Sequence, residues 1–199
     1  MSQQNHVTKI FRFHKIGGPE VLKIEDVPSR QPSKGEACLS VQAIGLNRAE
    51  SMFMHGYYLE PPQLPATLGY EASGIVTAIG ANVDPSWLNK NVSTIPAFSM
   101  NQYGVLGNEV IVPAHALAEY PSILTPVEAT SIWMQYLTPY GALVEFGQVK
   151  QGEFVLITAA SSSVGLAAIQ IVKAEGAISI ATTRTGANEA NCLHSARIT

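Results

Sequence analysis

Charged residues are scarce in this sequence. They make up 14% of its 199 residues, the formal net charge is −3, and no run of basic residues occurs. This composition argues against nucleic acid and anionic membrane surfaces as partners, since both need clustered Lys and Arg. No apolar run reaches the ~18 residues of a membrane span, and residues 1–6 lack the basic and then apolar order of a secretory signal. We therefore expect a cytoplasmic protein that acts on a small molecule.

The sequence is also poor in groups that bind metals or form disulfides. It has two cysteines, Cys38 and Cys192, which lie far apart and belong to no C-x-x-C pair, so no disulfide framework or zinc knuckle is indicated. None of the five histidines lies at metal-ligand spacing from another histidine or from a cysteine. The local sequence predicts no metal site, and we expect Cys38 to be a small buried apolar residue.

What the sequence does contain is a pattern of strand, tight turn and helix around residue 160. Residues 154–157 are apolar on both faces, which is typical of a parallel strand covered by helices, and residues 166–173 form an apolar helical run. The three glycine places of the dinucleotide fingerprint G-x-G-x-x-G are held by Ala160, Ser162 and Gly165. The pattern favours a dinucleotide site, and an ordinary strand–turn–helix without cofactor is the alternative.

A second strand follows this helix and indicates which dinucleotide binds. Gly176 can end the helix and residues 177–182 can form the next buried strand. An NAD site places an acidic residue about 20 residues beyond the turn, whereas residues 182–185 read Thr-Thr-Arg-Thr. Arg184 can pair with a 2'-phosphate, which favours NADPH, and the alternative is a solvated loop arginine.

The N-terminal part has a different pattern, with short alternating strands and turn residues that predict a β-rich, barrel-like domain. Asn47 is expected to cap a short helix over residues 48–55, and residues 125–128 have a capping-box pattern with proline at the first helical position. A helix is expected over residues 129–144, interrupted at Pro139. We predict two domains, residues 1–122 and 123–199. The expected strands are residues 8–13, 20–27, 36–44, 72–80, 92–95 and 109–113.

In five segments the sequence resembles the medium-chain dehydrogenase/reductases, in particular their zinc-independent quinone oxidoreductase or zeta-crystallin-like branch. Together these segments span nearly all of residues 8–185. The resemblance implies a GroES-like barrel followed by a partial α/β Rossmann domain, with NADPH in the cleft between them. The segments are residues 13–22, 44–50, 68–74, 136–138 and 159–173.

The resemblance also implies that the protein acts without zinc. The zinc alcohol dehydrogenases of the same superfamily have Cys and His where this chain has Asn47 and Tyr70, and no Cys lies between Cys38 and Cys192 to form their structural zinc lobe. Without zinc to polarise an alcohol oxygen, the resemblance implies reduction of a quinone or α,β-unsaturated carbonyl compound. Such a substrate needs only hydrogen bonds to its developing oxyanion.

The resemblance implies roles for individual residues. Asn47 and Tyr58 are the expected catalytic residues, and their alternatives are a helix cap and a half-buried loop tyrosine. Thr138 is expected near the nicotinamide ribose, with an ordinary helix threonine as the alternative. The expected cofactor-binding residues are Thr138, Ala160, Ser161, Ser162, Ser163, Val164, Gly165, Thr183 and Arg184.

The last segment, residues 186–199, departs from the family pattern. Relatives continue with more strands and then return to complete the catalytic domain, and two full domains need about 300 residues. We expect a C-terminally truncated chain that binds NADPH weakly or not at all by itself and is active only in its complete form, a homodimer. The alternatives are an alcohol, aldehyde or enoyl-thioester oxidoreductase on the same scaffold, or a non-catalytic NADPH-binding or structural protein.

Overall fold

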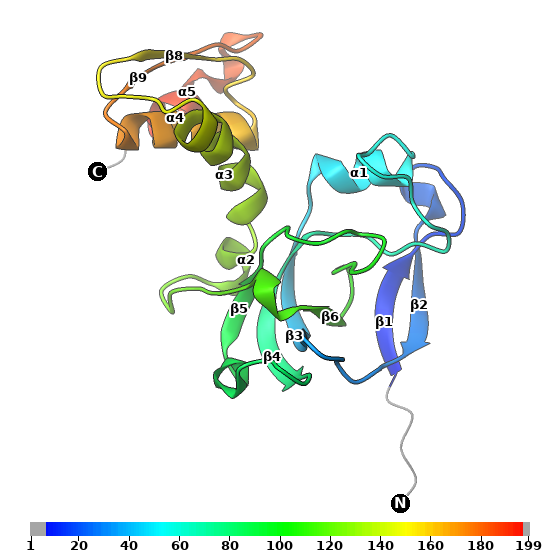
Figure 1. Cartoon of the computed structure of the whole chain (residues 1–199). Coiled ribbons are helices and arrows are strands. Elements are labelled where there is room, and N and C mark those ends of the chain that lie inside the picture. Colours follow the sequence, from blue (N-terminus) through cyan, green and yellow to red (C-terminus); the bar gives the residue numbers. More distant parts are fainter. Residues whose placement is uncertain (1–6, 197–199) are drawn as a thin grey trace, which may run out of the picture. The chain divides into compact units, whose positions relative to one another are not determined.

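The computed structural model of the chain describes residues 7–196 (Figure 1). Contacts between residues divide the chain into two compact units, Met1–Ser131 and Ile132–Thr199. This division does not test the functional domains 1–122 and 123–199, which stay a prediction. None of the helices within residues 7–196 has the length and apolar character that crossing a bilayer requires.

The first unit is rich in β-structure, as predicted. Strands β6, β3, β4, β5 and β7 pair in that order as one antiparallel sheet, and β1 pairs with β2 as a separate hairpin (Figure 1). Each predicted strand is present, with bounds that differ from the predicted ones by at most a few residues. Strand β7 was not predicted. The strands are β1 (Val7–Arg12), β2 (Lys23–Pro28), β3 (Glu36–Gly45), β4 (Glu71–Ile79), β5 (Asn91–Thr94), β6 (Glu109–Pro113) and β7 (Leu117–Glu119).

Alternating apolar residues of these strands form the core of the first unit. Leu39 of β3, Val76 of β4, Val92 of β5 and Val112 of β6 are all fully buried in one cluster. Burial of such side chains contributes about 1.5–3 kcal/mol each relative to full exposure, so this cluster is the main source of stability in the unit. Cys38 is buried in β3 as predicted.

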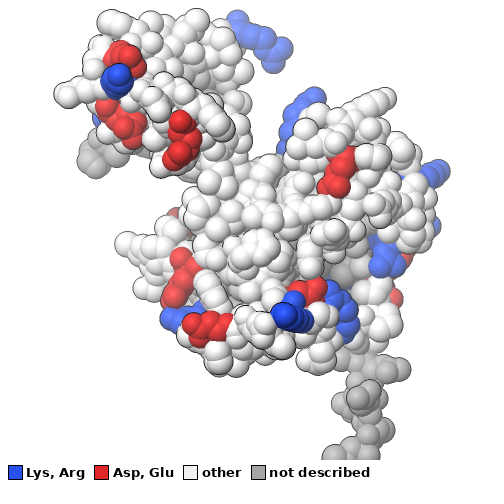
Figure 2. Space-filling model, viewed as in Figure 1, with Lys and Arg blue, Asp and Glu red and all other residues white. Residues whose placement is uncertain are grey.

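Short helices close the loops of the first unit. Helix α1 (Arg48–Met54) follows Asn47 as predicted, and the proline-led helix α2 (Pro126–Ala129) begins with the predicted capping box at Thr125. The 3-10 turns are η1 (Pro19–Val21), η2 (Pro85–Trp87) and η3 (Ala114–Ala116). On the face shown in Figure 2, acidic and basic side chains are interspersed over this unit.

The second unit contains the predicted strand–helix–strand arrangement. Strands β8 (Phe154–Ile157) and β9 (Ile178–Ala181) pair in parallel and are joined through α4 (Ser163–Ala174). Ile157, Ile169, Val172 and Cys192 form its buried core, in which α5 (Glu189–Ser195) packs against α4. The 3-10 turn η5 (Gly186–Asn188) precedes α5.

The expected burial of β8 on both faces is wrong for the described residues. Phe154 and Leu156 are 70% and 63% exposed, and Ile178 and Ile180 of β9 are also exposed. Helices α4 and α5 lie on one side of the two-stranded sheet (Figure 1), and alternate side chains therefore project from its other face.

The predicted helix over residues 129–144 is also corrected. The chain leaves helical structure after α2 and resumes it in α3 (Trp133–Tyr140), so the interruption precedes Pro139 and does not fall on it. Pro139 lies inside α3, and the following residues continue as a π-helix, η4 (Gly141–Phe146). Proline removes one backbone donor from a helix, and wider i→i+5 bonding follows it here.

Candidate functional site

A turn joins β8 to α4 at the predicted place. Ala159 adopts a left-handed conformation with φ of 49°, one residue before the first fingerprint place at Ala160. Ser162 caps α4, and its Oγ accepts a hydrogen bond of 3.1 Å from the backbone N–H of Gly165. The first amides of a helix have no intrahelical partner, so the start of α4 next to this turn is a place where phosphate groups can bind.

Gly165 is the fingerprint glycine that the sequence retains, and the structure shows why a side chain does not fit there. A Cβ at this position would lie 2.7 Å from the carbonyl oxygens of Ala159 and Ala160 and from the Cα of Ala160. The helix thus packs directly on the backbone of the turn, which fixes the start of α4 relative to β8.

The end of β9 is tied to this turn. The backbone N–H of Ala160 donates to the carbonyl of Thr182 at 3.1 Å, and the N–H of Thr182 donates to the carbonyl of Ile157 at 2.9 Å. A pocket of about 430 Å³ lies between the two segments. Its lining residues are Ala159, Ser161, Ser162, Thr182, Thr183 and Arg184.

Four predicted cofactor residues thus meet in one pocket, namely Ser161, Ser162, Thr183 and Arg184. The others lie around it or apart from it. Ala160 is fully buried, and Ser163 and Val164 are exposed on the first turn of α4. Thr138 does not line this pocket; it is exposed on α3, and its hydroxyl donates to the carbonyl of Met134 at 3.2 Å.

Arg184 provides positive charge at the pocket. Its side chain is exposed, and within residues 7–196 no carboxylate pairs with it. The hydroxyl of the neighbouring Thr183 donates to the carbonyl of Thr185 at 2.6 Å, which holds the loop after β9. An arginine without a carboxylate partner is suited to pair with a phosphate.

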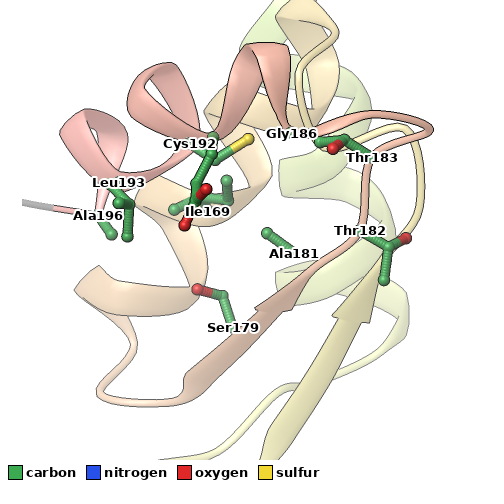
Figure 3. A pocket seen from close by; sticks show the side chains of 10 residues that line it. Ile169, Ser179, Ala181, Thr182, Thr183, Gly186, Cys192, Leu193 and Ala196 are labelled. Carbon is green, nitrogen blue, oxygen red and sulfur yellow. The ribbon is translucent and has the colours of Figure 1, made fainter.

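A larger pocket of about 580 Å³ lies between β9 and α5 (Figure 3) and shares Thr182 and Thr183 with the first pocket. Its lining mixes apolar side chains, such as Ile169 of α4 and Leu193 of α5, with the hydroxyl groups of Ser179, Thr182 and Thr183. Its charged lining residue is the carboxylate of Glu189, and no Lys or Arg lines it. Despite its volume, this pocket is the poorer site for a dinucleotide phosphate because its charge has the wrong sign.

In the first unit, Asn47 is held by two carboxylates. Its backbone N–H donates to Oε2 of Glu50 at 2.7 Å in a capping box at the start of α1. Its side-chain Nδ2 donates to Oε2 of Glu71, the first residue of β4, at 2.8 Å. The expected helix cap is therefore confirmed, and the side-chain amide has a partner that the sequence did not indicate.

Both carboxylates are buried. Burial raises the pKa of Glu50, and the nearby charge of Glu71 raises it further, although hydrogen bonds from backbone amides oppose the shift. One of these amides is the N–H of Tyr70, which donates to Oε1 of Glu50 at 3.3 Å. A buried carboxyl group with a raised pKa beside a second one is a common feature of functional sites.

Tyr58 lies in a group of aromatic rings. Its ring centroid is 6.1 Å from that of Tyr70, which in turn is 5.6 Å from that of Phe98. Burial, and then a hydrogen bond with Tyr58, raises the pKa of Tyr70, so its hydroxyl stays neutral. No hydrogen bond joins Asn47 to Tyr58 in the described part of the chain; they are linked through Glu50 and Tyr70.

Neither Glu50 nor Glu71 was among the predicted site residues. Glu50 carries a signal that was available, since Asn47-x-x-Glu50 is a capping-box spacing. Glu71 carries no such local signal. It reaches Asn47 because Gly45 at the end of β3 pairs with Glu71 at the start of β4, which is a long-range contact.

Comparison with known proteins shows what the chain resembles. Residues 33–122 match the family model described as the alcohol dehydrogenase GroES-like domain. A quinone oxidoreductase of Pongo abelii is 33% identical over 177 residues, covering 88% of this chain and 53% of that protein. The synaptic vesicle membrane protein VAT-1 homolog of Rattus norvegicus is 33% identical over 160 residues, covering 79% of this chain and 38% of that protein.

Solved structures of the same two kinds of protein are also similar to this chain. The Escherichia coli quinone oxidoreductase complexed with NADPH has a TM-score of 0.83 and 32% identity, covering 94% of this chain and 56% of that chain. The human synaptic vesicle membrane protein VAT-1 homolog-like protein has a TM-score of 0.86 and 26% identity, covering 96% and 60%. The chain spans about half the length of the curated quinone oxidoreductases it matches.

Proposed function

Because the chain belongs to the medium-chain dehydrogenase/reductase superfamily, we propose that it forms part of an NADPH-dependent oxidoreductase that transfers hydride to a quinone or an α,β-unsaturated carbonyl compound without zinc. One observation carries the proposal. The fingerprint turn and the end of β9 line the same pocket, and Arg184 stands at its edge. Quinone oxidoreductase relatives, one of them solved with NADPH, support the same reading.

Different residues of the pocket suit different phosphate groups of NADPH. The N-terminus of α4 and the hydroxyls of Ser161 and Ser162 suit a pyrophosphate. Thr183 and Arg184, at the end of β9, suit the 2'-phosphate that distinguishes NADPH from NADH. In the described segment after β9, no acidic residue precedes Glu189 to repel that phosphate.

At the substrate, Asn47 and Tyr58 are the proposed hydrogen-bond donors. NADPH supplies the hydride when bound and becomes NADP⁺. The hydride adds to an electron-poor carbon of the substrate, the resulting oxyanion accepts hydrogen bonds, and a proton from solvent completes the reduction. Asn47 and Tyr70 present a neutral amide and a phenol in place of thiolate and imidazole ligands, which supports a reaction without zinc.

Cofactor titration tests the phosphate site. We expect NADPH to bind more tightly than NADH when each is titrated into the chain and nicotinamide fluorescence is followed. Arg184→Met should weaken NADPH binding roughly 10- to 150-fold and leave NADH binding unchanged, because one charge-assisted hydrogen bond is worth roughly 1.5–3 kcal/mol. Lys150→Met, which removes the same charge from an exposed position of the second unit, is the matched control. Equal affinity for both cofactors would contradict the proposal.

A non-catalytic NADPH-binding protein is the second candidate. It is favoured by relatives at 33% identity whose names describe a synaptic vesicle membrane protein and no reaction. Selective NADPH binding without consumption of NADPH in the presence of quinones or enones would support it. Steady oxidation of NADPH by a quinone, lost in Tyr58→Phe, would support the reductase.

The resemblance further supports a homodimer for the complete protein, and the composition of the sequence favours a cytoplasmic location; both stay proposals. Light scattering after size-exclusion chromatography measures the assembly. Fractionation of cells that express the complete protein measures the location.

A further inference from the structure

We propose that Glu71 is a positioning residue that fixes the orientation of the Asn47 carboxamide and leaves one of its N–H groups for the substrate oxygen. This inference rests on the proposed function, in which Asn47 is a hydrogen-bond donor. It adds a residue to which neither the sequence nor the resemblance gave a role.

The hydrogen bond between the two side chains decides which end of the amide faces which way. An ionised carboxylate only accepts hydrogen bonds. The atom of Asn47 that lies 2.8 Å from Glu71 Oε2 is therefore Nδ2, and the opposite orientation would bring two acceptor oxygens together. Glu71 thus selects the amide orientation in which Oδ1 faces the backbone N–H of Glu50, which is the orientation that the capping box of α1 also requires.

The backbone of Asn47 is held separately. Glu50 Oε2 accepts from its N–H at 2.7 Å, and Glu50 Oε1 accepts from the N–H of Tyr70 at 3.3 Å. Glu50 therefore fixes the position of the Asn47 backbone at the start of α1, and Glu71 fixes the orientation of the Asn47 side-chain amide. The two carboxylates have different tasks, and substitutions at each can be compared.

Glu71 is itself built rigidly into β4. It is 3% exposed, and the hydroxyl of the fully buried Thr94 donates to the carbonyl of Tyr70 at 2.7 Å and accepts from the N–H of Ala72 at 2.9 Å. These two bonds clamp the backbone on both sides of Glu71. A Cβ on Gly45 would lie 2.9 Å from Glu71 Cβ and 2.4 Å from the carbonyl oxygen of Thr130, so only glycine lets the three segments meet.

One donor of Asn47 remains available. An asparagine amide has two N–H groups, and Glu71 takes one of them. Among the described residues the second N–H has no hydrogen-bond partner, and Asn47 is half-buried. A carboxylate behind an amide polarises its other N–H in a cooperative network, which strengthens the hydrogen bond that this N–H donates.

Side-chain amide NMR of the chain tests the positioning directly. We expect the side-chain amide proton of Asn47 that Glu71 accepts, assigned from its loss in Asn47→Asp, to be shifted from free asparagine values and protected from exchange, and the second proton to exchange faster. Glu71→Ala should return both signals toward free values. Glu71→Gln, which keeps an acceptor but not the charge, should move them part of the way. If Glu71→Ala does not fold, the Glu71→Gln variant alone provides the test.

The control is Glu119→Gln, the same change at an exposed residue of β7 that pairs with Lys90. It should leave the Asn47 signals unchanged. If the Asn47 signals in folded Glu71→Ala and Glu71→Gln match those of the unsubstituted chain, the proposal is overturned.

Kinetics separates this proposal from the proposed function. Removal of a whole oxyanion donor lowers kcat about 10²–10³-fold. Glu71→Gln only loosens the orientation of such a donor, so in an active protein it should lower kcat on the order of tenfold, with little change in KM for NADPH. NMR shifts without any quinone reduction would leave the orientation by Glu71 standing and reject the reductase. An unchanged kcat alongside the NMR shifts would overturn the assigned role of Glu71 in the reaction.

Discussion

Apolar strands occur in both units, but only in the first are they covered. Leu39 in β3 is fully buried, whereas Leu156 in β8 is 63% exposed. The first unit surrounds its core with a five-stranded sheet and packed loops, and the described part of the second covers one face of two strands. The comparison teaches that the composition of a strand predicts its tendency to be buried, while the neighbouring layers decide its actual burial.

Matched leucine substitutions should give the largest difference between the units. Leu39→Ala is expected to destabilise the first unit by about 2–5 kcal/mol because it leaves a cavity in a closed core. Leu156→Ala should change the second unit by about 0.5 kcal/mol, as a surface substitution does.

The chain's two tryptophans allow the units to be measured separately. Trp87 lies in the first unit and Trp133 in the second. Urea unfolding in a Trp133→Phe background reports the first unit, and unfolding in a Trp87→Phe background reports the second. Similar losses for both leucines would show that β8 is covered on both faces in solution.

Gly165→Ala should be the strongest single disruption of the second unit. The added methyl group would meet three backbone atoms at 2.7 Å, so we expect a loss of about 1–3 kcal/mol from overpacking together with weaker NADPH binding. Gly141→Ala is the control, because nothing lies within 4 Å of a Cβ built there. An NADPH affinity equal in both variants would contradict the role of close packing at the turn.

Acid should affect the first unit through Glu36. Hydrogen bonds from Arg30, at 2.5 and 3.0 Å, lead the interactions that lower the pKa of Glu36 from 4.5 to about 2. A lowered pKa stabilises the fold above pH 4.5, and this stability is lost as the pH falls toward 2. Because Arg30 is half exposed, we expect on the order of 1–2 kcal/mol.

Urea unfolding of the Trp133→Phe protein between pH 5 and pH 2.5 measures this loss. Glu36→Gln should flatten the pH dependence within that window. An unchanged slope in Glu36→Gln would assign the acid sensitivity to other carboxylates.

Ala159→Gly should have the smallest effect, and the opposite sign. A left-handed alanine costs roughly 1–2 kcal/mol, while glycine loses about 0.4–1 kcal/mol through the greater freedom of the unfolded chain. With φ of 49° at Ala159, we expect a net gain of about 0.5 kcal/mol in the second unit. Ala160→Gly, which relieves no such strain, should destabilise it. A loss in both variants would mean that the turn is not strained.

Much of this arrangement was predictable from local sequence, for identifiable reasons. Capping residues at Asn47 and Thr125, the helix end at Gly176 and the strand–turn–helix around Gly165 depend on residues within one or two turns of each other. Ser161, Ser162, Thr183 and Arg184 were predicted to share a site and line one pocket.

The missed features depend on distant partners. The bond from Asn47 to Glu71 requires the register of β3 against β4, and the exposure of Phe154 depends on which layers cover the sheet. The break before α3 has no proline or glycine to announce it, whereas Pro139 misled the prediction because a π-helix accommodates it. Local patterns carry none of this information.

Hydrogen–deuterium exchange with saturating NADPH tests the central claim most directly, since it shows where the cofactor binds. We predict added protection in residues 158–165 and 182–184, with β1 and β2 unchanged, and loss of the protection at residues 182–184 when NADH replaces NADPH. Protection under α5 around Cys192 and Leu193, without protection of the turn, would contradict the proposed site.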